Sequence, residues 1–316
     1  MNQKTKKRIK IGVIITSILF ILMNIIAYFH AYKFTHFDTS ENLRTSQPKE
    51  LSIFQKLKAL TFGVNNPRPI NSNFPKRAFK VVKLQSNKQI ECWMIKTDSA
   101  KGTVAMFHGF SSNKSSLLNK SEIFLEMGYN TILVDFMGSG GSEGNQTTLG
   151  FYEAEEVKSV VDYLKSQGDS TIILFGSSMG AVAIMKSCAD YHLSVNSIII
   201  ECPFGSMLTT VQSRFRNMGV PSFPMANLLV FWGGLQNGFN AYHHNPEEYA
   251  KSIHCPTLLF YGMQDQNVSK KEIDQIFQNL SGKKYLKLFP NAGHGDYLKN
   301  YETAWRNEVQ TFLNPK

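Results

Sequence analysis

The hydrophobic pattern separates an apolar run near the N-terminus from a long region in which apolar and polar residues alternate. No residue from Ile11 to Tyr32 is charged, a run of 22 residues. As a helix rising about 1.5 Å per residue, the run spans about 33 Å, which is enough to cross the core of a bilayer. It is apolar on every side, whereas a helix of a globular domain usually keeps one polar side. We therefore expect a transmembrane helix at residues 11–32 after a basic tail at residues 1–10.

The charges around this run predict its orientation. The residues before it include five basic ones and no acid: Lys4, Lys6, Lys7, Arg8 and Lys10. Basic residues tend to stay on the cytoplasmic side, so the N-terminus is expected inside and the main domain on the exoplasmic or periplasmic side. A cleaved signal peptide is the alternative. The run is long for one, and Ala31 has the bulky Phe29 two places before it instead of the small residue that cleavage favours. A buried helix of a soluble domain is the other alternative.

From residue 79 onward, short β-rich runs alternate with amphipathic stretches. Strands are expected at Phe79–Leu84, Gln89–Ile95, Thr103–Phe107, Thr131–Asp135, Thr171–Phe175, Ser197–Glu201, Thr257–Tyr261 and Tyr285–Phe289. Helices are expected at Ser115–Met127, Tyr152–Ser166, Met179–Asp190, Lys270–Asn279 and Tyr297–Phe312. The first two strands are close enough to form a hairpin. The rest of the pattern is typical of an α/β domain, here residues 79–314, with a mostly parallel sheet covered on both faces.

Two segments do not follow this alternation. Residues 33–78 read as a linker, in which Pro48–Phe62 has the spacing of an amphipathic helix that either lies on lipid headgroups or packs on the domain. Residues 203–250 contain no clear strand and many Met and aromatic residues. We expect this insertion to form a lid above the sheet, and its apolar residues either line an acyl-chain pocket or pack the lid onto the domain.

Composition excludes several classes of protein. With 42% hydrophobic and 18% charged residues, the chain can bury a large core and is not disordered. Its four Cys include no C-x-x-C pair, which excludes a disulfide scaffold and a zinc ribbon. The net charge of +10 comes largely from the first 33 residues, and the remainder holds 28 Lys and Arg against 24 Asp and Glu. We therefore expect no nucleic-acid binding. The sequence also implies no metal or organic cofactor.

One serine lies in a setting typical of a catalytic nucleophile. Gly176–Gly180 reads Gly-Ser-Ser-Met-Gly and stands between an expected strand and an expected helix. A sharp strand-to-helix turn with small residues on both sides exposes the central hydroxyl, which here belongs to Ser178. By chance the motif alone would occur in about one chain in ten of this length, so its position carries the argument.

A serine hydroxyl needs a base, and the base needs an acid that orients it. His294 follows the last expected strand between small residues, and Asp265 follows the strand at Thr257–Tyr261. The chain order serine, acid, histidine is the order found with this kind of turn. Glu201, which ends the strand after the serine, is the competing choice for the acid.

Ester and amide hydrolysis also requires N–H donors for the oxyanion that develops on the substrate. The amide of Met179 follows the nucleophile directly, and the amide of Phe110 lies just after the strand at Thr103–Phe107. Gly109 would let substrate approach this loop, whereas His108 is expected to shape it.

Together these motifs resemble the α/β-hydrolase superfamily, and most of all its serine-aminopeptidase-like and acyl-esterase-like branch. The resemblance rests on the His-Gly-Phe at 108–110, the Asp-Phe-Met-Gly-Ser-Gly-Gly-Ser-Glu-Gly at 135–144, and the segments 176–180, 256–265 and 293–294. It covers about residues 79–314 and implies an eight-stranded, mostly parallel sheet. It also implies Ser178 as nucleophile, His294 as base and Asp265 as acid, with Phe110 and Met179 as oxyanion donors.

These observations predict a membrane-anchored serine hydrolase that cleaves carboxylic esters, among them lipid-like acyl esters or thioesters, through an acyl-enzyme on Ser178. Its partners would be a small or lipid-like acyl substrate and the membrane. Two alternatives remain, a peptidase or amidase of the same fold and a catalytically silent binding protein. The second would lack a member of the serine, histidine and acid set, and none is missing from the sequence.

Overall fold

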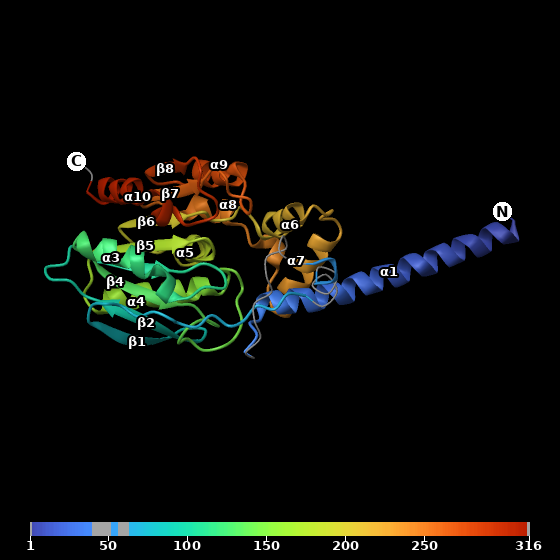
Figure 1. The fold of residues 1–316 in the computed structure, drawn as a ribbon, viewed down its shortest axis with the longest axis horizontal. Helices are drawn as coiled ribbons and strands as arrows, with labels where there is room; N and C mark the ends of the chain where they lie inside the picture. Colours follow the sequence, from blue (N-terminus) through green and yellow to red (C-terminus); the bar gives the residue numbers. More distant parts are fainter. Residues whose placement is uncertain (1, 40–51, 56–62, 315–316) are drawn as a thin grey trace.

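The computed structural model describes residues 2–39, 52–55 and 63–314. Most of the amphipathic helix predicted at Pro48–Phe62 lies outside these residues. The described chain forms a sheet with helices on both sides, a helical insertion at one end of the sheet and a long N-terminal helix beside this insertion (Figure 1).

Eight strands form one sheet in the order β1-β2-β4-β3-β5-β6-β7-β8. Their bounds are β1 Phe79–Gln85, β2 Gln89–Ile95, β3 Thr103–Phe107, β4 Asn130–Asp135, β5 Ile172–Ser177, β6 Ser197–Glu201, β7 Thr257–Gly262 and β8 Lys284–Phe289. β2 pairs antiparallel with β1 and with β4, and every other pairing is parallel. The predicted fold class is therefore confirmed, because parallel strands of β-branched and other apolar residues are buried on both faces.

Helices cover both faces of the sheet. One core cluster joins the sheet to helices α4 Glu153–Ser166, α5 Met179–Tyr191 and α9 Lys270–Asn279. The other joins it to α3 Leu118–Glu126 and α10 Tyr297–Leu313. The first helix after β3 is shorter than predicted, since its first turn is the 3₁₀ helix η1 at Lys114–Leu117.

The insertion after β6 is helical. It contains α6 Met207–Met218, α7 Met225–Gln236, η2 Ala241–His243, α8 Pro246–Tyr249 and η3 Ala250–Ser252. Figure 1 shows α6 and α7 at the end of the sheet that also faces the N-terminal helix. Phe204, Met207 and Phe215 are buried, so part of the apolar content of the insertion packs it onto the domain.

The N-terminal helix α1 runs from Gln3 to Thr35 and is longer at both ends than the predicted span. Among the described residues it is the one helix long and apolar enough to cross a membrane. Its first two thirds are exposed, whereas Ala27 and Ala31 are buried against α7. Beyond α1 the chain joins the domain, because the amide of Phe37 donates to the carbonyl of Asn145 over 2.6 Å.

The segment before β1, from residue 63 to residue 78, contacts the loop that follows β4. Arg68 donates to the carbonyls of Gly140, Ser142 and Gly144 in this loop. The carboxylate of Asp135, at the end of β4, accepts from the amide of Gly141 over 2.8 Å and pairs with the buried ammonium of Lys114. Asp135 and Arg68 thus both stabilise this loop.

Candidate active site

The turn between β5 and α5 presents Ser178 in a strained backbone conformation. Its φ of 52° and ψ of −112° lie outside the regions that residues other than glycine favour. The turn needs glycines on both sides, because a Cβ at Gly176 would lie 2.6 Å from the amide nitrogen of Ala181 and one at Gly180 would lie 2.3 Å from the carbonyl oxygen of Phe107. The sequence Gly-x-Ser-x-Gly therefore folds into a sharp elbow that keeps the Ser178 side chain half-buried rather than buried.

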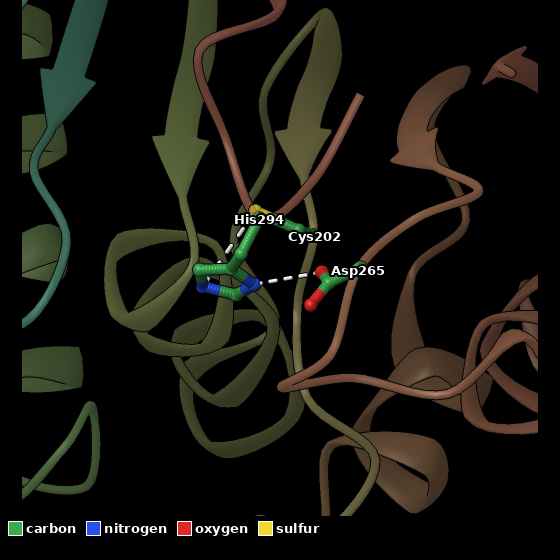
Figure 2. A group of neighbouring side chains, drawn as sticks. All are labelled: Cys202, Asp265 and His294. Carbon is green, nitrogen blue, oxygen red and sulfur yellow. Dashed lines mark hydrogen bonds and ion pairs between the residues drawn. The ribbon is translucent and has the colours of Figure 1, made fainter. Parts of the chain in front are cut away.

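Ser178, His294 and Asp265 lie in one hydrogen-bonded row. The Oγ of Ser178 is 2.9 Å from Nε2 of His294, and Nδ1 of the same ring is 2.7 Å from Oδ2 of Asp265. Figure 2 shows the imidazole pointing toward the Asp265 carboxylate. The distances fit the tautomer in which Nδ1 donates to the carboxylate and Nε2 accepts from the serine hydroxyl. The structure thus brings together three residues predicted from widely separated parts of the chain.

The loops after β7 and β8 cross closely, which places the carboxylate and the imidazole side by side. A Cβ at Gly262 would lie 2.3 Å from the carbonyl oxygen of Gly293, so only a glycine permits this crossing. The second carboxylate oxygen of Asp265 accepts from the amides of Asn267 and Val268 over 2.7 and 3.0 Å. With its side chain fully buried, Asp265 is held in one orientation toward His294.

The surroundings of His294 raise its pKa. Burial by itself lowers the pKa of the imidazole, but contacts with Cys202 and with the Asp265 carboxylate outweigh burial, and the pKa lies well above the ordinary 6.5. A carboxylate that favours the imidazolium is what a general base needs, because the base carries the positive charge while the hydroxyl attacks.

Glu201, the competing choice for the acid, has other partners. Its carboxylate accepts from Trp305 over 2.8 Å and from Lys120 over 2.5 Å, and its side chain is fully buried. The structure therefore joins His294 to Asp265 and ties Glu201 to α10 and α3. His108 is likewise structural, since its Nε2 accepts from the amide of Phe136 over 3.1 Å.

The two predicted oxyanion donors lie on either side of the elbow. Met179 begins α5 directly after Ser178, and Phe110 follows β3, the strand next to β5. In the described part of the chain neither amide donates to a protein acceptor. The nearest protein atom to a Cβ built on Gly109 would be 3.4 Å away, so the loop passes close to the elbow. Two free amides, one of them at the start of a helix, suit a developing negative charge.

Two residues of α1 and its continuation pack on Phe110, a contact that the sequence did not predict. The ring of Phe34 stacks on that of Phe110 with centroids 4.7 Å apart, and the buried ring of Phe37 lies 6.1 Å from it. From α6, the guanidinium of Arg214 lies 4.4 Å from the centre of the Phe34 ring. The sequence signal for this contact is only that residue 34 is apolar. The hydrophobic pattern does not show that its partner is Phe110, because the two residues are far apart in the sequence.

Cys202 is another residue near the site that the sequence did not single out. It follows β6, is buried, and its Sγ lies 4.0 Å from Nε2 of His294 (Figure 2). The rule that located Asp265 and His294, that the ends of parallel strands meet at one edge, also applies to Cys202. With Ser178 Oγ at 2.9 Å from the same nitrogen, the hydroxyl is the better placed nucleophile.

Cys202, Asp265 and His294 also form a group with potential metal-ligand atoms within 4.8 Å of one another. A thiolate and an imidazole would suit zinc. However, Nδ1 of His294 is already bonded to Asp265, so the ring offers only Nε2, the atom that faces Ser178. A metal bound there would occupy the nitrogen that proton transfer requires, and the geometry therefore suits acid–base chemistry.

Comparisons with known proteins agree with this arrangement. Residues 98–248 match the family described as serine aminopeptidase, S33. The chain is 25% identical over 216 residues to the uncharacterised protein YqkD of Bacillus subtilis (strain 168), covering 67% of this chain and 71% of that protein. It is 30% identical over 118 residues to the monoacylglycerol lipase abhd6-A of Xenopus laevis, covering 36% of this chain and about a third (34%) of the lipase.

A solved structure extends the likeness to most of the domain. The esterase Pf2001 of Pyrococcus furiosus superimposes with a TM-score of 0.64 at 22% identity, covering 79% of this chain and 96% of the esterase. The eight-stranded topology, the strand-to-helix elbow and the family match point the same way. The chain therefore has the α/β-hydrolase fold, and residues 98–248 within it are similar to the serine aminopeptidase S33 family.

Proposed function

We propose that this protein is a membrane-anchored serine hydrolase that cleaves carboxylic esters, including lipid-like acyl esters or thioesters. The observation that carries the proposal is the continuous row from Ser178 through His294 to Asp265, with contacts of 2.9 and 2.7 Å. The Ser178 hydroxyl has a base that can take its proton, and that base has a carboxylate that orients it. The neighbouring amides of Phe110 and Met179 are available to an oxyanion.

Acylation begins when Nε2 of His294 takes the proton of Ser178 and the hydroxyl oxygen attacks the carbonyl carbon. The amides of Phe110 and Met179 then donate to the negatively charged oxygen of the tetrahedral intermediate. As the bond to the leaving oxygen or sulfur breaks, the imidazolium of His294 returns its proton to the leaving group. The acyl group remains on Ser178, and an alcohol or a thiol departs.

Deacylation repeats these steps with water as the nucleophile. His294 takes a proton from water, which attacks the acyl carbon, and the collapse of the second intermediate releases a carboxylic acid and restores the Ser178 hydroxyl. Asp265 stabilises the imidazolium at both stages without itself taking the proton. The raised pKa of His294 is consistent with this support.

Esters are favoured over peptides by the composition of the lid. From Cys202 to Pro246 the sequence contains no Asp or Glu, so this part of the lid, which includes α6 and α7, offers no carboxylate to a peptide amine. The lid does contain exposed apolar residues, among them Phe223 and Phe231. An aminopeptidase-type activity remains the second candidate because of the family match at residues 98–248.

We further propose that α1 anchors the enzyme, with the N-terminus in the cytoplasm and the domain outside. Residues Ile11 to Tyr32 carry no charge, and the basic tail before them favours this orientation. Anchoring would present the lid to lipid esters, since α7 packs directly on α1.

A fluorophosphonate probe tests the nucleophile on the full-length chain in detergent. We expect labelling of the wild type, no labelling of Ser178→Ala and retained labelling of Cys202→Ala, which is the matched control for the other nucleophile near His294. Absence of labelling on correctly folded wild type would favour a binding protein. Next, p-nitrophenyl esters of increasing acyl length are compared with aminoacyl amides, and faster turnover of the amides would contradict the ester assignment.

A further inference from the structure

The lid contains a surface that nothing in the hydrolytic mechanism uses. From Asn217 to Pro246 the sequence contains no Asp, Glu, Lys or Arg, a charge-free stretch of 30 residues that includes all of α7. Three large apolar side chains on α7 and in the loop before it are exposed, Phe223 at 77%, Phe231 at 48% and Leu235 at 59%. A charge-free surface with several large apolar side chains is typical of a site that contacts lipid or another protein.

This surface is fixed to α1 by hydrogen bonds and close packing. Nε1 of Trp232 donates to Oδ1 of Asn24 over 3.2 Å, and the Gln236 amide donates to the Tyr28 carbonyl over 2.8 Å. Gly233 faces the buried Ala31, and a Cβ built on Gly233 would lie 3.9 Å from the Cβ of Ala31. Small residues and side-chain amides at the contact are characteristic of helices that associate within membranes. Figure 1 shows α7 beside the end of α1 nearest the domain.

The length of α1 then places α7 relative to the bilayer. A hydrocarbon core of about 30 Å needs about 20 helical residues, so a span that begins at Ile11 extends to about His30. The contacts with α7 already begin at Asn24. Were the lid kept outside the lipid, only Ile11–Met23 would remain to span the core, and 13 residues cover only about 20 Å. Tilting α1 would require still more residues.

We propose that α7 and the loop before it lie within the outer leaflet, so that the lid is a lipid-docking surface and the substrate is an ester that resides in the membrane. The inference rests on the anchoring role proposed above for α1. The partner is the acyl-chain region below the headgroups. Asn24 lies six residues before His30, the expected end of the span, so the contact with α7 reaches about 9 Å into the hydrocarbon core. Asn24, a polar residue within the apolar run, is satisfied there by Trp232 and by the carbonyl of Phe20.

Trp232 provides a native reporter for this placement. The other two tryptophans, Trp93 and Trp305, are buried in the domain, at 2% and 0% exposure. The full chain is reconstituted into phosphatidylcholine vesicles whose acyl chains carry bromine at carbons 6,7 or 11,12. We expect bromine to quench part of the tryptophan emission, more strongly from carbons 11,12 because Trp232 bonds to Asn24 at the deep end of the contact, and this quenched part to disappear in Trp232→Phe.

A second variant separates the lid from the anchor. Ser17 lies in the exposed part of α1, and the Ser17→Trp, Trp232→Phe double variant reports insertion of that helix. Quenching of the double variant without quenching of Trp232 in the wild type would overturn the lid placement and leave the anchor standing. Quenching of neither would overturn both. Hydrolysis of a water-soluble ester in detergent reports the serine chemistry separately, so its loss would not be confused with either outcome.

A kinetic comparison tests the consequence for substrate. Phe223→Ser with Leu235→Ser should lower turnover of a long-chain ester in vesicles several-fold and leave turnover of a soluble short-chain ester unchanged. Val81→Ser, which removes an exposed apolar side chain on β1, far from α7 in the sequence, is the control and should change neither rate. Equal loss on both substrates would contradict a lipid-docking role for the lid.

Discussion

Phe34, in the last turn of α1, stacks on Phe110 with ring planes 17° apart and centroids 4.7 Å apart. The first residue belongs to the helix proposed as the anchor, and the second supplies a proposed oxyanion donor. Backbone bonds on the same segment, from Thr147 to the carbonyl of Thr35 and from Phe37 to that of Asn145, fix the end of α1 to the domain. Helix α1 is therefore a structural part of the candidate site.

Phe34→Ala should weaken the support of the oxyanion loop. An aromatic pair contributes about 0.5–1.5 kcal/mol beyond its buried area, so we expect kcat/KM to fall about 2- to 10-fold. The measurement is steady-state hydrolysis of one soluble ester by the full chain in detergent. Phe29→Ala, which removes an exposed aromatic side chain of α1, is the control and should retain activity. Equal activity of the two variants would show that the Phe34–Phe110 stack does not position the loop.

Replacing the acid should change both the rate and its pH dependence. In serine hydrolases, loss of the orienting carboxylate typically lowers kcat by about 10⁴-fold, and we expect a similar loss for Asp265→Asn. Because the pKa of His294 is raised, wild-type kcat/KM should fall as pH drops through a value above 6.5, where the imidazole becomes protonated. Removing the carboxylate lowers this pKa, so any residual activity should persist to lower pH.

Glu201→Gln is the control for that experiment. Its carboxylate contacts Lys120 and Trp305, so the substitution should lower thermal stability while leaving the pH profile of kcat/KM in place. A shifted profile in Glu201→Gln, with a normal one in Asp265→Asn, would reassign the acid.

Gly180→Ala should disrupt the elbow, because its Cβ would lie 2.3 Å from the Phe107 carbonyl oxygen and backbone would have to move. We expect loss of fluorophosphonate labelling together with a lower melting temperature. Gly109→Ala on the facing loop is the matched control, since its nearest contact would be 3.4 Å, and it should fold normally. Normal labelling of Gly180→Ala would mean that the turn tolerates a side chain.

Asp135→Asn should affect stability more than chemistry. It leaves the buried Lys114 ammonium without its nearest carboxylate, and breaking a buried pair typically costs about 3–5 kcal/mol. Burial raises the pKa of Asp135, but Lys114 and hydrogen bonds outweigh burial and lower it. The stabilisation is therefore complete above the pKa of an unfolded aspartate and is lost as pH falls through the lowered native pKa.

Chemical unfolding at pH 7 and at acidic pH measures this contribution. The difference in free energy of unfolding between wild type and Asp135→Asn should shrink at acidic pH. Asp162→Asn, which breaks an exposed pair with Lys158 on α4, should cost no more than about 0.5 kcal/mol at either pH. A pH-independent difference for Asp135→Asn would contradict the ion-pair explanation.

The sheet and the serine row follow from local signals. Strands such as β3 and β5 are largely apolar because both faces of the sheet are covered. Gly176 and Gly180, two residues before and after Ser178, mark a turn that leaves no room for a Cβ. Asp265 and His294 were located because parallel strands end at one edge.

The rest depends on contacts that no local pattern specifies. The individual helices α6 and α7, and the stack of Phe34 on Phe110, result from tertiary packing between segments far apart in sequence. The strand-end rule also applied to Cys202. A small buried thiol has no distinctive pattern, however, so its approach to His294 emerged only from the fold.

The pairing of Thr35 and Phe37 with the loop at residues 145–147 has a consequence for processing of the chain. A protease that cut between Ala31 and Phe34 would separate the domain from most of α1. The short segment from Phe34 to Phe37 would then have to hold its contacts with the domain without the rest of the helix. Release of a diffusible catalyst by such a cut would thus come with a loosened oxyanion loop. Proteolytic release of the domain would therefore inactivate the enzyme instead of secreting it in an active form.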